Sequence, residues 1–191
     1  MINIPNNEQS KLKMEFTLKI SLVGDTTAGK STFLMRLLTG EYNDHLIMTV
    51  GVDFAQEKIK FENAILKCQF WDMTGTQRFK FLYTTYLKGT DGVLLFFALN
   101  EPDRFQLLLE DLEKLKEIIP DIPILLIGTK SEIDAKISKS DIVELIQRHN
   151  NQIFDYIEIS SKTGKNVNKV MEILLSKIFY ISLNAPKKQK K

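Results

Sequence analysis

FTLKISLVGDTTAGKSTF, residues 16–33, takes the chain from an apolar strand through a glycine-bracketed turn into a helix. Its Gly24, Gly29, Lys30 and Ser31 satisfy the pattern G-x-x-x-x-G-K-[ST] where the strand gives way to the helix. A loop of this kind wraps backbone N–H groups around an anion, and the following helix directs its positive end at the same charge. The alternative, a glycine-containing turn before an ordinary helix, is disfavoured by the flanking strand and helix. The stretch therefore predicts a phosphate-binding loop.

Two side chains of this loop carry specific expectations. Lys30 would reach the β- and γ-phosphates of a nucleotide as a point charge, which makes it a catalytic candidate. The Ser31 hydroxyl would coordinate Mg²⁺, a hard cation that prefers oxygen ligands. The residues expected to contact the nucleotide here are Gly24, Asp25, Thr26, Thr27, Ala28, Gly29, Lys30, Ser31 and Thr32.

Length and composition favour one globular domain. The chain has 191 residues, of which 43% are apolar and 26% charged, enough for a sizeable core. Its 26 basic and 24 acidic side chains nearly balance, which argues against a nucleic-acid partner. A single cysteine, and the lack of a secretory signal pattern or an apolar run of ~18 residues, favour a cytoplasmic protein. We expect a flexible arm over residues 1–15, the domain over 16–183 and a basic tail over 184–191.

The order of apolar segments predicts an α/β fold, and together with the phosphate-binding loop it indicates the P-loop NTPase type. Strands alternate with helices, which implies a three-layer sandwich around a mostly parallel six-stranded sheet with about five helices. Ligands then bind at the carboxyl ends of the strands. Strands are expected over residues 16–23, 51–61, 65–72, 93–100, 122–127 and 154–159. Helices are expected over 29–38, 102–119, 140–149 and 164–182, with a loop and an irregular helix over 74–89.

The end of the third predicted strand carries a second phosphate-side pattern. Asp72 ends this strand, where a carboxylate can hold Mg²⁺, and Gly75 can offer its N–H to a terminal phosphate. Thr49, in the loop before the second strand, can add a hydroxyl to the same ion. Its alternative reading is simply a β-former that opens a strand.

Four blocks then resemble the Ras superfamily of small GTPases, most of all its Rab branch. They are TVGVDF (49–54), WDMTGTQRF (71–79), YLKGTDGVLLFFAL (86–99) and EISSKTGKNV (158–167), in family order and spacing. The likeness covers residues 16 to about 182. It implies a switch that binds GTP or GDP with Mg²⁺, the metal being held by Ser31, Thr49 and Asp72.

The resemblance also implies the remaining contacts. Tyr42 matches the aromatic residue that stacks on the base, and Phe54, Trp71 and Tyr86 match the aromatic triad that Rab proteins present to effectors. The alternative for the triad is a place in the core. Effectors, an exchange factor and a GTPase-activating protein are the implied partners of a monomer. The base-side residues are Thr129, Lys130 and Glu132, followed by Ser160, Ser161 and Lys162.

The catalytic segment departs from the family pattern. The family places glutamine directly after the switch glycine to orient water, but here that residue is Thr76, and Gln77 follows. Because phosphoryl transfer depends on positioning, we expect slow intrinsic GTP hydrolysis, with Thr76 and Gln77 as catalytic candidates. Thr27 stands where glycine is common, so the loop should bend differently there or bind phosphate less tightly. Thr74 adds a hydroxyl near the expected γ-phosphate.

The guanine-reading segment departs as well. Its usual pattern N-K-x-D is here Thr129, Lys130, Ser131 and Glu132. Glu132 keeps the carboxylate that accepts from guanine but adds a methylene. We still expect guanine, because the Ser161 N–H can recognise the guanine carbonyl.

Two functions from different classes fit these observations. The first is a Rab-like nucleotide switch, and the second is a pseudo-GTPase that binds nucleotide weakly or constitutively and acts as an interaction module. A P-loop kinase is disfavoured because no lid-like basic segment appears.

The tail APKKQKK lacks the cysteines that carry prenyl groups, but its four lysines can contact anionic lipid weakly.

Overall fold

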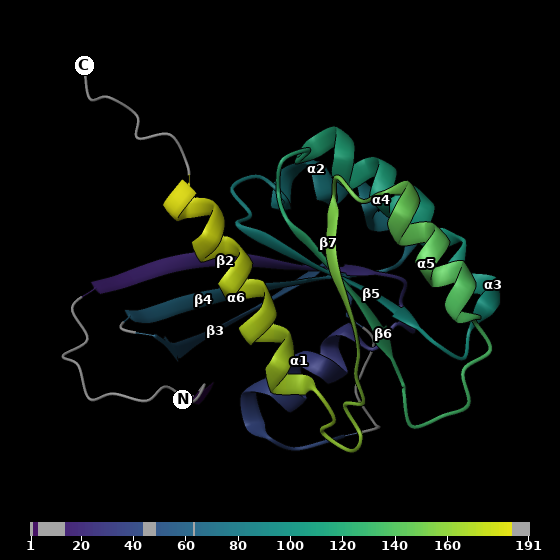
Figure 1. The fold of residues 1–191 in the computed structure, drawn as a ribbon, viewed down its shortest axis with the longest axis horizontal. Helices are drawn as coiled ribbons and strands as arrows, with labels where there is room; N and C mark the ends of the chain where they lie inside the picture. Colours follow the sequence, from purple (N-terminus) through teal and green to yellow (C-terminus); the bar gives the residue numbers. More distant parts are fainter. Residues whose placement is uncertain (1, 4–13, 44–48, 63, 185–191) are drawn as a thin grey trace.

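The sheet runs through the centre of the molecule and confirms the predicted α/β sandwich (Figure 1). The computed structural model describes residues 2–3, 14–43, 49–62 and 64–184. The strand order is β1-β3-β4-β2-β5-β6-β7, in which β3 is antiparallel to β4 and the other neighbours are parallel. The strands are β1 (Ile2–Asn3), β2 (Met14–Gly24), β3 (Val52–Phe61), β4 (Ala64–Met73), β5 (Gly92–Ala98), β6 (Ile124–Thr129) and β7 (Ile153–Glu158).

The six predicted strands are β2 to β7. A further two-residue strand, β1, pairs with Ile59 and Lys60 of β3 at one edge of the sheet. It lies in the segment expected to be an arm, and β2 begins at Met14, two residues before the predicted strand. The predicted tail lies outside the described residues, apart from Asn184.

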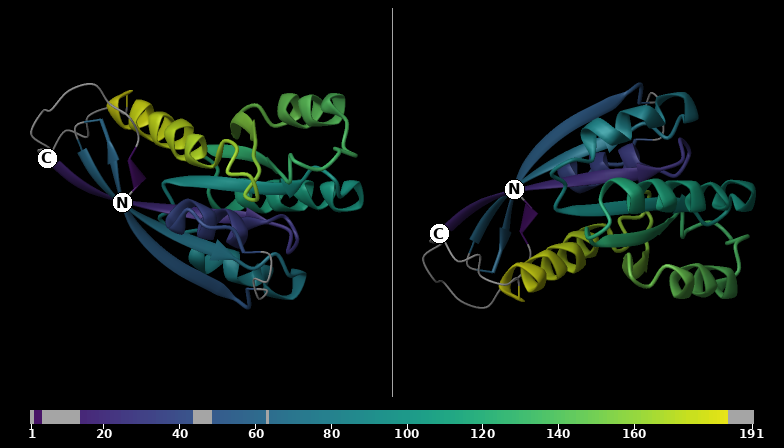
Figure 2. Two further views of the ribbon diagram at one scale, coloured as in Figure 1. Left: turned by 90° about the horizontal axis from the view of Figure 1, so that it is seen from below. Right: turned by 90° about the horizontal axis from the view of Figure 1, so that it is seen from above.

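Helices cover both faces of the twisted sheet (Figure 2). In Figure 1, α2, α4 and α5 lie along the upper right of the sheet, while α1 and α6 lie on the other side. The described helices are α1 (Lys30–Thr39), the 3-10 helix η1 (Gln77–Leu82), α2 (Tyr83–Tyr86), α3 (Pro102–Phe105), α4 (Leu107–Ile118), α5 (Lys139–Arg148) and α6 (Val167–Asn184). None of the helices in the described ranges combines the length and apolar character required to cross a membrane.

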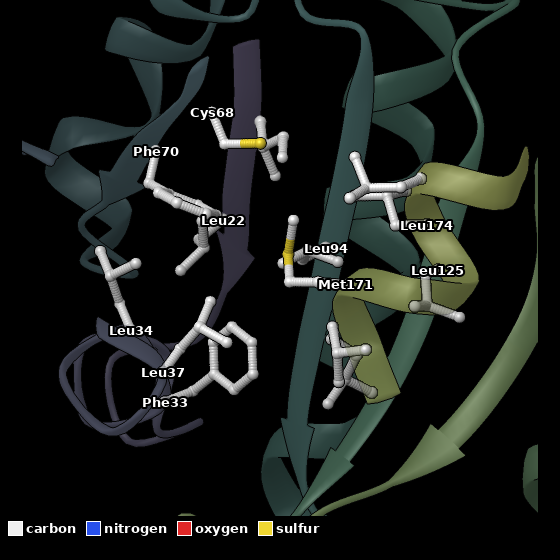
Figure 3. Packing of buried hydrophobic residues seen from close by; sticks show 14 of the residues in the cluster. Leu22, Phe33, Leu34, Leu37, Cys68, Phe70, Leu94, Leu125, Met171 and Leu174 are labelled. Carbon is white, nitrogen blue, oxygen red and sulfur yellow. The ribbon is translucent and has the colours of Figure 1, made fainter. Parts of the chain in front are cut away.

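The core has one apolar cluster on each face of the sheet. Figure 3 shows Phe33 and Leu37 of α1 beside Leu22 of β2, with Met171 of α6 against Leu94 of β5. All seven residues of β5 and all six of β6 are buried, as expected for parallel strands covered on both faces. This burial fixes the sheet, and so the positions of the loops at its carboxyl edge.

One helix differs from the sequence prediction. The segment expected to form a single helix over 102–119 is divided into α3 and α4 at Gln106. Around this point the backbone forms tighter i→i+3 hydrogen bonds, including Leu109 N–H to the Gln106 carbonyl at 3.2 Å. The Phe105 ring packs against Phe97 of β5, with centroids 5.1 Å apart, which holds α3 against the sheet. Glu101 and Arg104, at the start of this segment, contact the phosphate loop.

The single cysteine, Cys68, should be chemically inert in the folded protein. Its side chain is fully buried in β4, and burial raises the pKa of its thiol to about 12. Because the thiolate is the reactive form, we expect no reaction with a disulfide reagent at neutral pH and one equivalent of reaction in denaturant. Colorimetric thiol titration checks this. Rapid stoichiometric labelling without denaturant would contradict the packing of β4.

Candidate phosphate and metal site

The predicted phosphate loop connects β2 to α1. Gly24 has φ +133° and Gly29 φ +81°, values that residues with side chains rarely adopt. A Cβ on Gly24 would lie 2.2 Å from the Phe96 carbonyl oxygen, so the close approach to β5 also requires glycine. Gly29 is the N-cap of α1 without a side-chain cap, and no acidic residue lies in the first turn. The N–H groups at this helix end are therefore available to an anion.

Lys30 lies within this loop. Its side chain is 4% exposed, and Nζ donates to the carbonyl oxygens of Gly24 and Asp25, each at 2.8 Å. Burial lowers the pKa of Lys30, whereas the nearby Asp72 carboxylate opposes that shift. The ammonium group is thus held among carbonyls in a site from which water is largely excluded, where a phosphate would be a strong partner.

Ser31, Thr49 and Asp72, the three predicted metal ligands, lie together at the start of α1. Ser31 Oγ donates to Asp72 Oδ2 and lies 2.9 Å from Thr49 Oγ1, while Thr49 Oγ1 is 3.4 Å from the same carboxylate oxygen. Burial raises the pKa of Asp72, although the Ser31 hydrogen bond opposes this. The other oxygen, Asp72 Oδ1, is buried without a hydrogen-bond partner in the described part of the chain.

This donor set fits Mg²⁺ rather than a softer metal. Within the described ranges no group of three His, Cys, Asp or Glu side chains is placed to hold an ion. The site instead offers two hydroxyls and one carboxylate, and the orphaned Asp72 oxygen would accept a hydrogen bond from a metal-bound water. Mg²⁺ commonly binds through few protein oxygens, and phosphates and waters complete its shell.

The segment after β4 packs directly on the phosphate loop. Gly75 is buried, and a Cβ there would lie 2.1 Å from the Thr26 nitrogen. Thr74 is buried as well, and its hydroxyl lies 3.1 Å from Thr76 Oγ1 and accepts from the Thr76 N–H at 3.3 Å. The two threonine hydroxyls therefore bond to each other. Gln77 begins η1, but its side chain lies outside the described part of the structure.

Gly75→Ala should destabilise the protein by about 1–3 kcal/mol, because the added methyl group overpacks against backbone that has little room to move. Urea unfolding of the nucleotide-free protein measures this. The matched variant is Gly89→Ala, where φ is +73° but nothing lies within 4 Å of the new Cβ. There we expect about 1 kcal/mol from backbone strain alone. Wild-type stability in Gly75→Ala would show that residues 74–76 do not rest on the loop.

Thr129, on the base side, is buried, and its hydroxyl donates to the Ala28 carbonyl at 2.9 Å and to that of Phe97 at 3.1 Å. It therefore ties the phosphate loop to β5 and β6. Lys130 has φ +61°, and its Nζ lies 2.5 Å from Glu101 Oε1.

The other predicted base contacts lie in two loops. Glu132 is exposed. Ser160 is buried and accepts from the Thr163 N–H at 3.0 Å, while Lys162 is exposed and Ser161 half-buried. Tyr42 is 39% exposed in the loop after α1, so its ring is accessible for stacking.

Sequence reasoning missed Glu101 and Arg104 at this site. Arg104 donates to the Asp25 carboxylate, and Glu101 accepts from Thr27 and Lys130. Burial opposes ionisation of Asp25, but the Arg104 hydrogen bond leads the effects that bring its pKa below the usual value. Both missed residues follow the carboxyl end of β5, the edge where ligand contacts were expected. That position was the available signal.

Thr27 occupies its place in the loop without a left-handed backbone. Among the described non-glycine residues, positive φ occurs at Glu62, Lys130 and Asn166. The Thr27 hydroxyl donates to Glu101 and lies 3.4 Å from an Asp25 carboxylate oxygen. A β-branched side chain is therefore accommodated here by local hydrogen bonding.

Phe54, Trp71 and Tyr86 form one aromatic cluster on the surface. Centroids of Phe54 and Trp71 are 5.2 Å apart, and those of Trp71 and Tyr86 5.5 Å apart. Phe54 is 49% exposed and the other two are half-buried, while Lys19 Nζ lies 4.7 Å from the Trp71 centroid. All three side chains are therefore at least partly exposed at the surface, and none is confined to the core.

The α/β sandwich, the glycine loop that opens onto a helix N-terminus and the hydroxyl–carboxylate cluster beside it define a P-loop nucleotide-binding protein. A family model described as the Ras family matches residues 19–180. The chain belongs to this family of small GTPases.

Its relatives include Rab proteins and proteins similar to them. Ras-related protein Rab-1 of Theileria annulata is 30% identical over 181 residues, which cover 90% of this chain and 80% of that protein. GTP-binding protein ypt3 of Schizosaccharomyces pombe is 29% identical over 172 residues, 89% and 79% of the two chains. Ras-related protein SEC4 of Saccharomyces cerevisiae is 29% identical over 154 residues, 80% and 71%.

Proposed function

We propose that this protein is a Rab-like switch that binds GTP and GDP with Mg²⁺ and hydrolyses GTP slowly. The observation that carries the proposal is the convergence of Ser31, Thr49 and Asp72 on the N-terminal end of α1. A nucleotide phosphate at that helix end would bring its own oxygens to the same ion. Bound Mg²⁺ would neutralise phosphate charge as it develops during cleavage.

Different residues of the chain would contact the phosphates and the base. The N–H groups of the loop and the buried Lys30 ammonium would hold the phosphates, and Gly75 would offer its N–H to the terminal one. Tyr42 would stack on the base, with Glu132 and the Ser161 N–H selecting guanine. Loops that carry Thr49 and Gly75 would be ordered by a γ-phosphate and released after cleavage.

Slow hydrolysis is proposed from the residues beside Gly75. Thr76 stands where an amide would orient the attacking water, and its hydroxyl is hydrogen-bonded to Thr74. Such an arrangement leaves the nucleophile poorly positioned.

Effectors would read the switch surface through Phe54, Trp71 and Tyr86, because half-exposed aromatic residues anchor many interfaces. By its likeness to Rab proteins, we place the switch in membrane trafficking, with an exchange factor and a GTPase-activating protein as partners.

Competition between GTP and ATP for a fluorescent GDP analogue tests the nucleotide assignment. We expect GTP to displace the analogue and ATP to fail at the same concentration, since a carboxylate placed for guanine leaves polar groups unpaired with adenine. Equal competition would refute the guanine assignment.

Single-turnover GTP cleavage tests the catalytic proposal. Thr76→Gln should raise the rate on the order of 10- to 100-fold if poor positioning of water is the limitation. Cleavage by the unaltered protein at ordinary Ras-like rates would argue against the proposal, and Gln77→Ala would then show whether Gln77 supplies the amide.

The second candidate is a pseudo-GTPase that serves as an interaction module. Thr76, whose hydroxyl is hydrogen-bonded to that of Thr74, and Glu132 favour it. The first stands where an amide would orient water, and the second adds a methylene to the carboxylate that accepts from guanine. Binding of guanine nucleotide without cleavage in Thr76→Gln would support this candidate over the switch.

A further inference from the structure

Charged side chains surround the outer wall of the phosphate loop. Arg104 Nη1 donates to Asp25, and Lys130 Nζ lies 2.5 Å from Glu101 Oε1. Arg104 Nε also lies 3.5 Å from Glu101 Oε2. The two acids and two bases neutralise one another, so the wall adds no net negative charge next to an incoming phosphate.

Glu101 is the member of this group that joins two loops. One carboxylate oxygen accepts from Thr27 in the phosphate loop, and the other accepts from Lys130 in the base-side loop. The Glu101 side chain is 23% exposed and that of Lys130 is 30% exposed, so their ion pair is not freely solvated. Thr27, the other partner of Glu101, is exposed. Burial disfavours the charged form, but the Lys130 and Thr27 hydrogen bonds hold the pKa of Glu101 below its usual value.

Glu101 restrains the Lys130 side chain more than an ion pair restrains an ordinary surface lysine. Its backbone is left-handed at φ +61°. The preceding residue, Thr129, is buried, and the N–H of the following residue, Ser131, donates to the Ile159 carbonyl at 3.1 Å. The backbone therefore fixes where the side chain begins, and Glu101 fixes where it ends. A long side chain restrained at both ends can lie along a base without further loss of conformational freedom.

We propose that Glu101 is a positioning residue for the nucleotide, which couples Lys130 on the base side to Thr27 on the phosphate side. This inference rests on the proposed function. With Glu101 in place, both loops are restrained before ligand arrives, and the nucleotide leaves slowly. Without Glu101, Lys130 regains its freedom and Thr27 loses a hydrogen-bond acceptor.

Dissociation of a fluorescent GDP analogue in the presence of Mg²⁺ measures the effect. Glu101→Ala should raise the dissociation rate about tenfold, and Glu101→Gln should raise it less, because the amide oxygen still accepts one of the two hydrogen bonds. In a Lys130→Ala background, Glu101→Ala should add much less than its effect alone. This non-additivity distinguishes coupling through Lys130 from a general structural role.

Glu144→Ala is the matched control, since Glu144 forms an exposed ion pair with Arg148 on α5, away from the loop. Its dissociation rate should equal that of the wild type. An unchanged rate in Glu101→Ala, or an undiminished effect in the Lys130→Ala background, would overturn the inference. If Glu101→Ala does not fold, a Glu101→Gln rate equal to the wild type overturns it. Wild-type protein that binds no guanine nucleotide overturns the proposed function itself.

Discussion

Lys30→Met should weaken nucleotide binding strongly. Removal of one partner from a buried, hydrogen-bonded charge pair costs about 2–5 kcal/mol, which is roughly a 30- to 5,000-fold loss of affinity. Lys30 is 4% exposed and its Nζ is already held inside the loop. The ammonium group is therefore in place to pair with a nucleotide phosphate. Titration of a fluorescent GDP analogue measures the loss.

The same substitution separates binding from stability. Burial, which lowers the pKa of Lys30, disfavours its charged form in the nucleotide-free fold, but the substitution also leaves the Gly24 and Asp25 carbonyl oxygens without the Nζ donor. We therefore expect a loss of stability of no more than about 1–3 kcal/mol. Lys169→Met, at an exposed position of α6, serves as the control for both measurements. Undiminished nucleotide affinity in Lys30→Met would remove Lys30 from the phosphate site.

Asp111→Ala should destabilise the protein by about 3 kcal/mol. Asp111 in α4 is 1% exposed and lies 2.8 Å from Lys80 Nζ, which is 4% exposed in η1. Truncation of the acid leaves a buried ammonium group without its nearest partner. We expect the lower part of the ~3–5 kcal/mol range for a broken buried pair, because Glu110 Oε2 lies 3.6 Å from the same nitrogen.

A double variant provides the second half of this test. Burial raises the pKa of Asp111 despite its bond to Lys80, so the pair itself contributes little net stability. Lys80→Met with Asp111→Leu should therefore recover most of the lost stability, since apolar replacement of a buried pair is often neutral or better. Urea unfolding of both variants checks this. A double variant as unstable as Asp111→Ala would mean that loss of packing, rather than an unpaired charge, dominates.

Local patterns were sufficient to predict six of the seven described strands and the place of the glycine loop. Strand β5, read as VLLFFALN in the sequence, is buried throughout, and the glycine loop lies between β2 and α1 as its spacing required. Ser31, Thr49 and Asp72 come from distant parts of the chain, yet they meet because each lies beside the same edge of the sheet.

The remaining features depend on tertiary contacts that no local pattern encodes. The break at Gln106 follows from packing of Phe105 on β5, which overrides the helical periodicity of residues 102–119. Glu101 and Arg104 read as ordinary charges at a helix start, and only the fold shows that they face Thr27 and Asp25. The burial of Lys80 with Asp111 was equally invisible, since a charged residue in a helix of mixed apolar and polar residues is ordinarily expected on the solvated face.

Release of bound GDP with and without a chelator tests the nucleotide and metal site most directly. The protein is loaded with a fluorescent GDP analogue and Mg²⁺, excess unlabelled GDP is added, and the dissociation rate is followed before and after addition of EDTA. We expect EDTA to accelerate release at least tenfold in the wild type, and Asp72→Ala to release quickly with or without it. Slow release that EDTA leaves unchanged would contradict a metal shared by the nucleotide and Ser31, Thr49 and Asp72.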